Sequence, residues 1–193
     1  MTDWTEILAS AKNGDEAAFE QIVLAFEKKV YAYLFQMLAN REDAMEATQD
    51  TFLRLWRTLP GFRSDCSLSG WIFRIARTAG LDALRAGRPD PVSLDPSPDD
   101  EDTDQTLQLP DESVESDPVR STMRDLDAQA VHRAIAKLSP PLRDVLVLRY
   151  MQNLSYDEIA QILGTSAKVV KSRLDHAKKK MKILLLQDGN FSR

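Results

Sequence analysis

The residues best suited to binding chemistry are basic side chains between Lys168 and Lys182, near the end of the chain. Apolar residues interrupt them at helical spacing, so a helix would turn the apolar side chains toward one side. The expected inward positions are Val170, Leu174, Ala177 and Met181. The side chains left facing outward are Lys168, Lys171, Ser172, Asp175, His176, Lys178, Lys179 and Lys182. Such a face suits the phosphates of a nucleic acid, although a lysine-rich face can also simply be solvated.

The residues just before this segment predict a helix-turn-helix motif. Ser155 and Glu158 have the spacing of a capping box, which marks the start of a short helix. Gly164 permits the positive φ of a tight turn, and Ser166 can cap the basic helix that follows. In this motif the second helix enters the major groove, and its N-terminal part faces the base edges. The predicted base contacts are Lys171 and Ser172, with Lys168 and His176 beside them, and the predicted phosphate contacts are Arg173, Lys178 and Lys179.

Aromatic and arginine residues alternate in an earlier segment of the chain. Its members are Phe62, Arg63, Trp71, Phe73, Arg74, Arg77 and Arg85. Aromatic rings can stack on unpaired bases while arginines hold the phosphates of a single strand. The same pattern also suits core aromatics beside solvated arginines, and spacing alone leaves both interpretations open.

Long segments without Pro or Gly, rich in Ala, Leu, Arg and Glu, favour an all-α fold. Ahead of the helix-turn-helix, we expect helices over residues 3–12, 15–39, 42–59, 69–86, 117–138 and 139–150. In the last of these, the residues expected to face inward are Leu142, Val145, Leu146 and Tyr150.

The helix expected over residues 42–59 has two apolar faces. Phe52 and Leu55 belong to one stripe, and Leu53 and Trp56 lie about 100° around the helix from it. One face can enter the core of its own domain. The other needs a partner or a neighbouring helix.

An acidic segment separates the helical parts of the chain. Between Arg88 and Arg120 there are 11 acidic and 2 basic residues, so a chain with a net charge of −5 carries +4 elsewhere. This segment has no periodicity and cannot bury enough apolar surface to offset its chain entropy, so we expect a flexible acidic linker. The sequence therefore predicts two small helical domains, 1–87 and 118–193, joined by the linker 88–117. Their mildly basic surfaces remain compatible with nucleic acid.

The sequence offers little for catalysis or metal binding. Cys66 is the single cysteine, which excludes an intramolecular disulfide and leaves a redox role for its thiol open. His132 and His176 are the only histidines, and their spacing gives no zinc site. We therefore expect no cofactor, no metal and no enzymatic activity. With neither a leader-like start nor an apolar run of membrane length, the chain is expected in the cytoplasm.

Taken whole, the chain resembles the extracytoplasmic-function (ECF) sigma factors, the smallest class of the sigma-70 family. Three motifs in order carry the resemblance: DAMEATQDTFLRLWR at 43–57, FR at 62–63 with WIFRIAR at 71–77, and LSYDEIA at 154–160 with VKSRL at 170–174 and AK at 177–178. They extend over about four-fifths of the chain, all but the linker and the ends.

The resemblance implies a function for each domain. Residues 1–87 would be sigma region 2, which docks on the clamp coiled coil of core RNA polymerase and melts the downstream promoter element. Residues 118–193 would be sigma region 4, which recognises the upstream element and touches the polymerase flap. The polymerase-binding residues implied are Asp43, Glu46, Gln49, Asp50, Leu53, Arg54 and Trp56. The promoter-melting residues implied are Arg63, Trp71, Arg74, Arg77, Thr78 and Arg85.

The resemblance also implies an anti-sigma factor as a partner. Thr78 stands where many members of the family carry Asn, in the pocket for a flipped base, so the base preference cannot be copied from them. The alternative function is that of a two-domain helix-turn-helix regulator, which would bind duplex DNA as a dimer without docking on polymerase.

Overall fold

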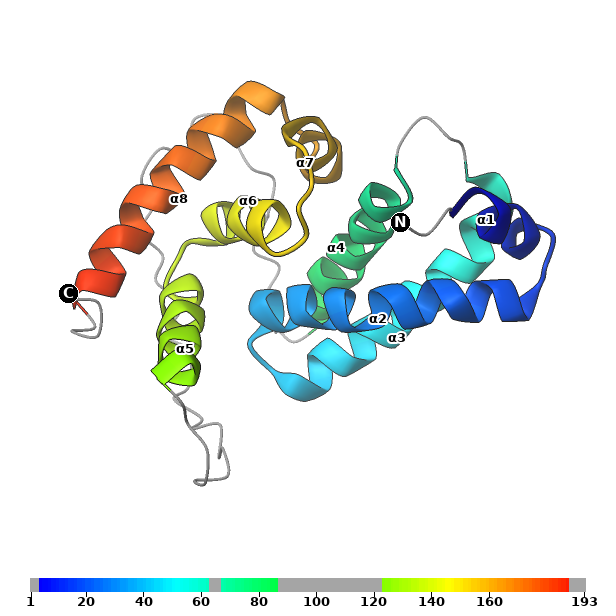
Figure 1. The fold of residues 1–193 in the computed structure, drawn as a ribbon, viewed down its shortest axis with the longest axis horizontal. Helices are drawn as coiled ribbons and strands as arrows, with labels where there is room; N and C mark the ends of the chain where they lie inside the picture. The colour runs from blue at the N-terminus through cyan, green and yellow to red at the C-terminus, as the bar shows by residue number, and fades with distance from the viewer. Residues whose placement is uncertain (1–3, 63–66, 87–122, 188–193) are drawn as a thin grey trace.

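The computed structural model describes residues 4–62, 67–86 and 123–187, and within these ranges the chain is helical with no strand (Figure 1). The first domain contains α1 (Trp4–Lys12), α2 (Glu16–Leu38), α3 (Arg41–Thr58), a short 3-10 helix η1 (Leu59–Gly61) and α4 (Leu68–Ala86). The second contains α5 (Met123–Ala136), α6 (Pro140–Tyr150), α7 (Tyr156–Leu163) and α8 (Ala167–Gln187). The all-α fold with a C-terminal helix-turn-helix is thus confirmed, and the linker 88–117 lies outside the described residues.

Side-chain caps fix the boundaries of the helices in the first domain. The Asp15 carboxylate accepts hydrogen bonds from the backbone N–H groups of Ala17 and Ala18, at 3.0 and 3.2 Å, where α2 begins. Asn40 does the same for Glu42 at the start of α3, at 2.8 Å. Each cap satisfies a donor that the first turn of a helix leaves without a partner.

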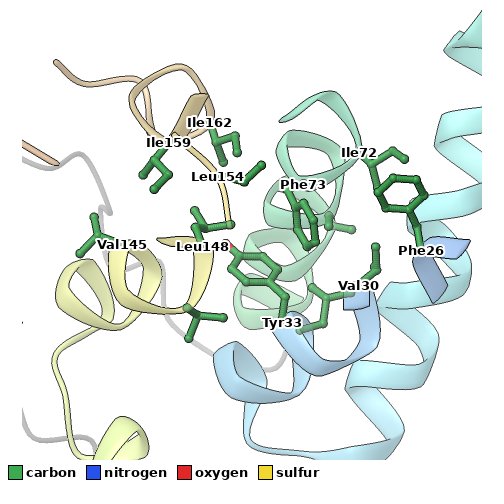
Figure 2. Packing of buried hydrophobic residues seen from close by; sticks show 14 of the residues in the cluster. Phe26, Val30, Tyr33, Ile72, Phe73, Val145, Leu148, Leu154, Ile159 and Ile162 are labelled. Atoms are coloured by element: carbon green, nitrogen blue, oxygen red, sulfur yellow. The ribbon is translucent and has the colours of Figure 1, made fainter. Parts of the chain in front are cut away.

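The helices α2, α3 and α4 enclose the core of the first domain. Phe26 and Val30 of α2 meet Ile72 of α4 (Figure 2). Leu55 of α3 is fully buried. A Cβ atom at Gly80 of α4 would lie 2.7 Å from the Met37 sulfur, so this glycine is what lets α4 approach α2 so closely.

The two domains pack on each other through α6 and α7 of the second domain, with α7 lying against α4. Seven consecutive residues of this helix, Leu142–Leu148, are buried, whereas a helix packed on one side buries only a stripe. One side of α6 contacts α8, and the other faces α2 and α4 (Figure 1). Tyr33 and Phe73 of the first domain lie against Leu148 and Leu154 of the second (Figure 2), so both domains share one apolar core.

The expectation that Tyr150 faces inward was wrong. Its side chain is 54% exposed, and Lys178 of α8 lies over its ring at 5.8 Å from the centroid. Leu142, Val145 and Leu146 are buried as expected. Tyr150 is the last residue of α6, and its ring lies at the open groove beside α8 and not in the core.

A buried carboxylate joins the two domains. The Asp144 side chain of α6 accepts a hydrogen bond from the Tyr33 hydroxyl at 3.5 Å and one from Arg77 Nε at 3.4 Å. Burial raises the pKa of the Asp144 carboxyl, and the opposing attraction of Arg77 does not cancel that effect. Burial likewise raises the pKa of the Tyr33 hydroxyl, with the Asp144 charge adding to the shift. The carboxylate thus stays hydrogen-bonded on both oxygens, yet ionising it at this site is harder than in water.

This raised pKa predicts the direction of a pH effect on stability. Asp144 faces Tyr33 of α2 and Arg77 of α4, with Arg143 beside it in α6, and the packed state binds its proton more tightly than the unfolded chain does. The tighter proton binding of Asp144 in the packed state adds to the free energy of unfolding. This addition is fully present below the ordinary aspartate pKa and is lost as pH rises through the raised pKa. Relative to Asp144→Asn, the wild type should gain free energy of unfolding as pH falls toward that ordinary value. Urea unfolding of both proteins across this range measures the difference, and parallel curves would contradict it.

Candidate nucleic-acid interface

The start of α7 has the capping box that the sequence predicts. The Glu158 N–H donates to Ser155 Oγ at 3.2 Å, and the Ser155 N–H donates in return to a Glu158 carboxylate oxygen at 2.8 Å. Gly164 ends the helix with φ of 65°, in the left-handed region that glycine tolerates. The chain then turns at Ser166, whose hydroxyl accepts from the Val169 N–H at 3.4 Å, and α8 begins. Local chemistry therefore sets where α7 ends and α8 begins, and the packing of both helices on each other and on α6 completes the motif.

The two faces of α8 are divided as the sequence predicts. The inward residues Val170, Leu174, Ala177 and Met181 are buried. The exposed side chains are Lys168, Lys171, Ser172, Asp175, His176, Lys178, Lys179 and Lys182. Arg173 is half-buried at the edge of this face. The exposed set forms one continuous basic face, with Asp175 as its only acid among the residues named.

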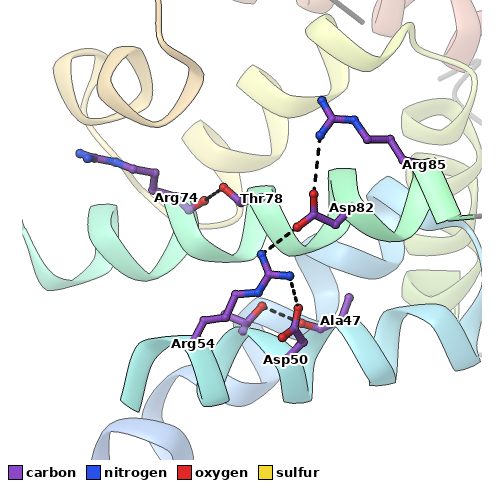
Figure 3. A network of polar contacts seen from close by, with 8 residues as sticks. Ala47, Asp50, Arg54, Arg74, Thr78, Asp82 and Arg85 are labelled. Carbon is purple, nitrogen blue, oxygen red and sulfur yellow. Dashed lines mark hydrogen bonds and ion pairs between the residues drawn. The ribbon is translucent and has the colours of Figure 1, made fainter. Parts of the chain in front are cut away.

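The predicted promoter-melting residues lie mostly on α4 but differ in exposure. Arg74, Thr78 and Arg85 are exposed, and the Thr78 hydroxyl donates to the Arg74 carbonyl at 3.0 Å (Figure 3). Trp71 is half-buried, with its ring 4.8 Å from that of Phe62.

Besides the half-buried Trp71, three members of the aromatic-arginine cluster do not face solvent freely, and the first is Phe62, which is 7% exposed. Phe73 is 1% exposed, so the core interpretation holds for that ring. Arg77 is half-buried and donates to Asp144 of the second domain. Arg63, like Cys66, lies outside the described residues.

The exposed side of α3 carries the residues expected to bind polymerase. Asp43, Glu46, Gln49 and Leu53 are exposed, and Leu53 has 56% of its surface free. The opposite side buries Phe52 and Leu55, so the two faces expected for this helix are both present.

The remaining residues of the predicted polymerase set are half-buried. Arg54 contacts the carboxylates of Asp50 at 2.7 Å and Asp82 of α4 at 2.8 Å, and these hydrogen bonds raise its pKa (Figure 3). Asp82 also pairs with Arg85 at 3.6 Å. Trp56 packs on Phe19 at 4.7 Å between ring centroids, so it belongs partly to the domain's own core.

Comparison with known proteins assigns the chain to a family. The model of sigma-70 region 2 matches residues 22–89, and that of sigma-70 region 4 matches residues 128–181. The RNA polymerase sigma-H factor of Pseudomonas aeruginosa is 30% identical over 90% of this chain and 89% of its own length. The ECF RNA polymerase sigma-E factor of Salmonella typhimurium is 30% identical over 89% of this chain and 88% of its own. The chain belongs to the ECF sigma factors.

A solved structure agrees with this fold. CnrH in complex with the cytosolic domain of CnrY matches with a TM-score of 0.69 and 24% identity, over 96% of this chain and 99% of that one. In this sigma factor, the region 2 match includes α3 and α4, and the region 4 match includes all of α7. Apart from Lys182, each basic or docking face described above therefore lies within a matched region.

An apolar groove lies on the outer side of the second domain. Its volume is about 450 Å³, and its lining residues are Leu146, Tyr150, Lys178, Met181, Lys182, Leu185 and Leu186. Elsewhere, the ranges that the structure describes contain no cluster of three or more His, Cys, Asp or Glu side chains fit to hold a metal. Nor do they contain a helix with the length and apolar character of a membrane span.

Sequence reasoning missed the residues that join the domains. Tyr33, Arg143, Asp144 and Glu158 all make contacts across the interface, and none was expected to. One signal was available, because α6 has apolar residues around most of its circumference, which is typical of a helix buried on more than one side.

The capping box predicts the cost of losing its serine. Ser155→Ala should lower the free energy of unfolding by about 1 kcal/mol, because the Glu158 N–H then has no side-chain acceptor. Ser172→Ala, an exposed serine on α8, is the matched control and should change stability by less than about 0.5 kcal/mol. Urea unfolding followed by circular dichroism measures both. Equal effects of the two substitutions would show that the cap contributes nothing.

Proposed function

We propose that this sigma factor binds core RNA polymerase, directs it to promoters and helps to open them, and that it has no catalytic activity of its own. The observation that carries the proposal is the order of two matched regions in one chain, region 2 before region 4, each with an exposed face suited to its partner. The alternative function, a helix-turn-helix regulator that does not dock on polymerase, leaves the exposed apolar residue Leu53 of α3 unexplained.

The basic face of α8 is the proposed reader of the upstream promoter element. Lys171 and Ser172 lie in its N-terminal half, the part that meets base edges when a recognition helix enters the major groove. Lys168 and His176 flank them. Arg173, Lys178 and Lys179 are assigned to phosphates, where they would neutralise charge and release counterions.

The exposed part of α4 is the proposed contact for the melted downstream element. Trp71 offers the edge of a ring for stacking, and Arg74 and Arg85 offer cations for phosphates. Thr78 is one helical turn from Arg74, so a flipped base held there would meet a hydroxyl rather than an amide. Arg77 and Arg63 complete the proposed set. Opening would be driven by these contacts with the unpaired strand, since unpairing costs a few kcal/mol.

Two surfaces are proposed for polymerase. The face of α3 with Leu53 at its centre, ringed by Asp43, Glu46, Gln49 and Asp50, would contact the clamp coiled coil, with Arg54 and Trp56 at its edge. The groove between α6 and α8 is apolar with lysines at its rim, and is the proposed contact for the flap. With both surfaces engaged, polymerase would fix the spacing of the two DNA-binding domains and raise their effective concentration on one promoter.

An anti-sigma factor is the further partner that we propose. The solved relative CnrH is in complex with the cytosolic domain of CnrY, and the exposed faces of α3 and α8 are available for such a protein. We place the protein in the cytoplasm because a sigma factor has to meet RNA polymerase there.

Run-off transcription with core polymerase over a promoter library tests the proposed function. We expect transcripts that start at a defined subset of promoters and that depend on the added protein. A protein that binds duplex DNA tightly as a dimer, and yields no transcripts with core polymerase, would instead be the helix-turn-helix regulator.

Lys171→Ala should weaken use of the upstream element and relax its sequence preference. A direct base contact is worth about 1–3 kcal/mol, so the effect should be about 10-fold or more at the contacted base. Lys179→Ala should weaken binding to all promoters evenly. It should also reduce the slope of log affinity against log salt concentration by about 1. Lys28→Ala, an exposed lysine of α2, is the control for charge. Run-off assays on promoters altered at single bases separate these outcomes, and an even loss for Lys171→Ala would exclude its role in base recognition.

Leu53→Ala should weaken binding to core polymerase by about 10-fold, since burying a leucine in an interface contributes about 1.5–3 kcal/mol. Leu24→Ala is the matched control because this leucine is also exposed, on α2, outside the proposed docking face. Affinity can be measured by fluorescence anisotropy with labelled protein and core polymerase. If both substitutions had the same effect, α3 would not be the docking helix.

A further inference from the structure

We propose that this sigma factor holds itself in a closed, inactive form through contacts between its own two domains, with Asp144 occupying the place of a DNA phosphate on Arg77. The inference rests on the proposed function. It adds that closure needs no second protein, and it names the residues responsible.

The apolar part of the interface is continuous with the core of each domain. Tyr33 and Phe73 are 1% exposed, and Leu148 and Leu154 of the second domain are 0% and 3% exposed (Figure 2). A separated first domain would leave the Tyr33 and Phe73 rings uncovered on the side where α6 and α7 now lie (Figure 1). Hydrophobic burial therefore favours closure whether or not a partner is bound.

The hydrogen bonds between the domains favour one particular arrangement of the closed form. Arg143 Nη1 donates to the Gln36 carbonyl at 2.9 Å, and the Gln36 side chain contacts His132 Nδ1 at 2.6 Å. At the other end, the Ser67 hydroxyl donates to Glu158, the residue that caps α7. These contacts come from three helices of the second domain and pair with the first domain at separate points. A shifted packing would lose these hydrogen bonds, so they favour this arrangement of the domains, although Arg143 Nε has no partner even here.

The contact of Asp144 with Arg77 links closure to function. Arg77 is one of the arginines proposed to hold the melted strand, and in the closed form its guanidinium is taken by a carboxylate. A carboxylate and a phosphate present the same kind of oxygen acceptors to arginine. Asp144 and the DNA strand therefore compete for one side chain, while α6 and α7 cover the neighbouring part of α4.

Closure should also be reversible. Once the domains separate, water can solvate Asp144, Arg77 and Arg143, which recovers much of what their burial costs. Polymerase could then open the protein by binding its two domains at a larger separation.

A disulfide across the interface tests the proposal in the full chain. A Cβ atom at Gly70 would lie 4.0 Å from the Glu158 Cβ, which is within the range of disulfide bonds. The test protein carries Gly70→Cys and Glu158→Cys, with Cys66→Ser to remove the one native cysteine. The two single-cysteine variants in the same background are the controls. Neither Gly70 nor Glu158 belongs to the proposed DNA or polymerase contacts.

With mild oxidant and no other protein present, we expect most of the double variant to form the intramolecular bond, seen as a shift on a non-reducing gel. The oxidised protein should support at least 10-fold less run-off transcription with core polymerase than the same sample after reduction. The single variants should respond to neither treatment. A bond that forms only in traces, or an oxidised protein as active as the reduced one, would overturn the proposal. If the reduced and wild-type proteins were both inactive with polymerase, the proposed function itself would fail, while bond formation would still report on closure.

A second variant covers the case in which the cysteine pair fails to fold. Asp144→Lys places a cation against Arg77 and should open the protein, giving a larger radius of gyration in small-angle scattering with an unchanged helical signal in circular dichroism. Asp157→Lys, an acid in the first turn of α7 with the same charge change, is the control. Equal radii for Asp144→Lys and the wild type would contradict the role of Asp144.

Discussion

The helical period imposes one constraint on every functional surface of this protein. Because a helix turns once in 3.6 residues, each helix that presents a face to DNA or polymerase also carries the stripe that holds it in its domain. In α8, Val170 and Leu174 are buried while Lys171 and Ser172 are exposed next to them. Any movement of the recognition residues would therefore have to carry the buried stripe with it. The small cores fix the functional faces, and the chain needs no further scaffold to orient them.

Local chemistry explains how much of this could be predicted from the sequence. The capping box at Ser155, the turn at Gly164 and the four inward residues of α8 depend on neighbours within a few positions, and all three expectations are confirmed. The two faces of α3 follow from the same periodicity. The wrong placement of Tyr150 comes from extending a stripe to the last residue of α6, where the side chain lies at the open groove beside α8 and is only partly covered.

Contacts between distant residues could not be predicted in the same way. Tyr33 and Asp144 are 111 positions apart, and Gln36 and Arg143 are separated by 107. A single sequence gives no information on which surfaces meet across such a distance. The uncharged residues around α6 indicated burial on more than one side, but the polar groups Arg143 and Asp144 indicated solvent. Asp144 is buried against partners in the other domain, Tyr33 and Arg77, whereas Arg143 also donates to two carbonyls of its own domain, those of Ala136 and Leu138.

The ion pairs of Arg54 on the solvent-exposed side of the first domain differ in burial from the contact between Asp144 and Arg77. Arg54 connects α3 to α4 through Asp50 and Asp82, and all three side chains are more than a third exposed, so each pair contributes about 0–1 kcal/mol. This network connects α3, the helix proposed to dock on polymerase, with α4, the helix proposed to contact the melted strand, without adding much stability. Asp144, by contrast, is enclosed, and its pairing with Arg77 is possible only while the two domains touch. With the role proposed for Arg77, the same arginine would not serve the closed protein and the DNA strand at once, so closure and promoter opening would exclude each other at a single side chain.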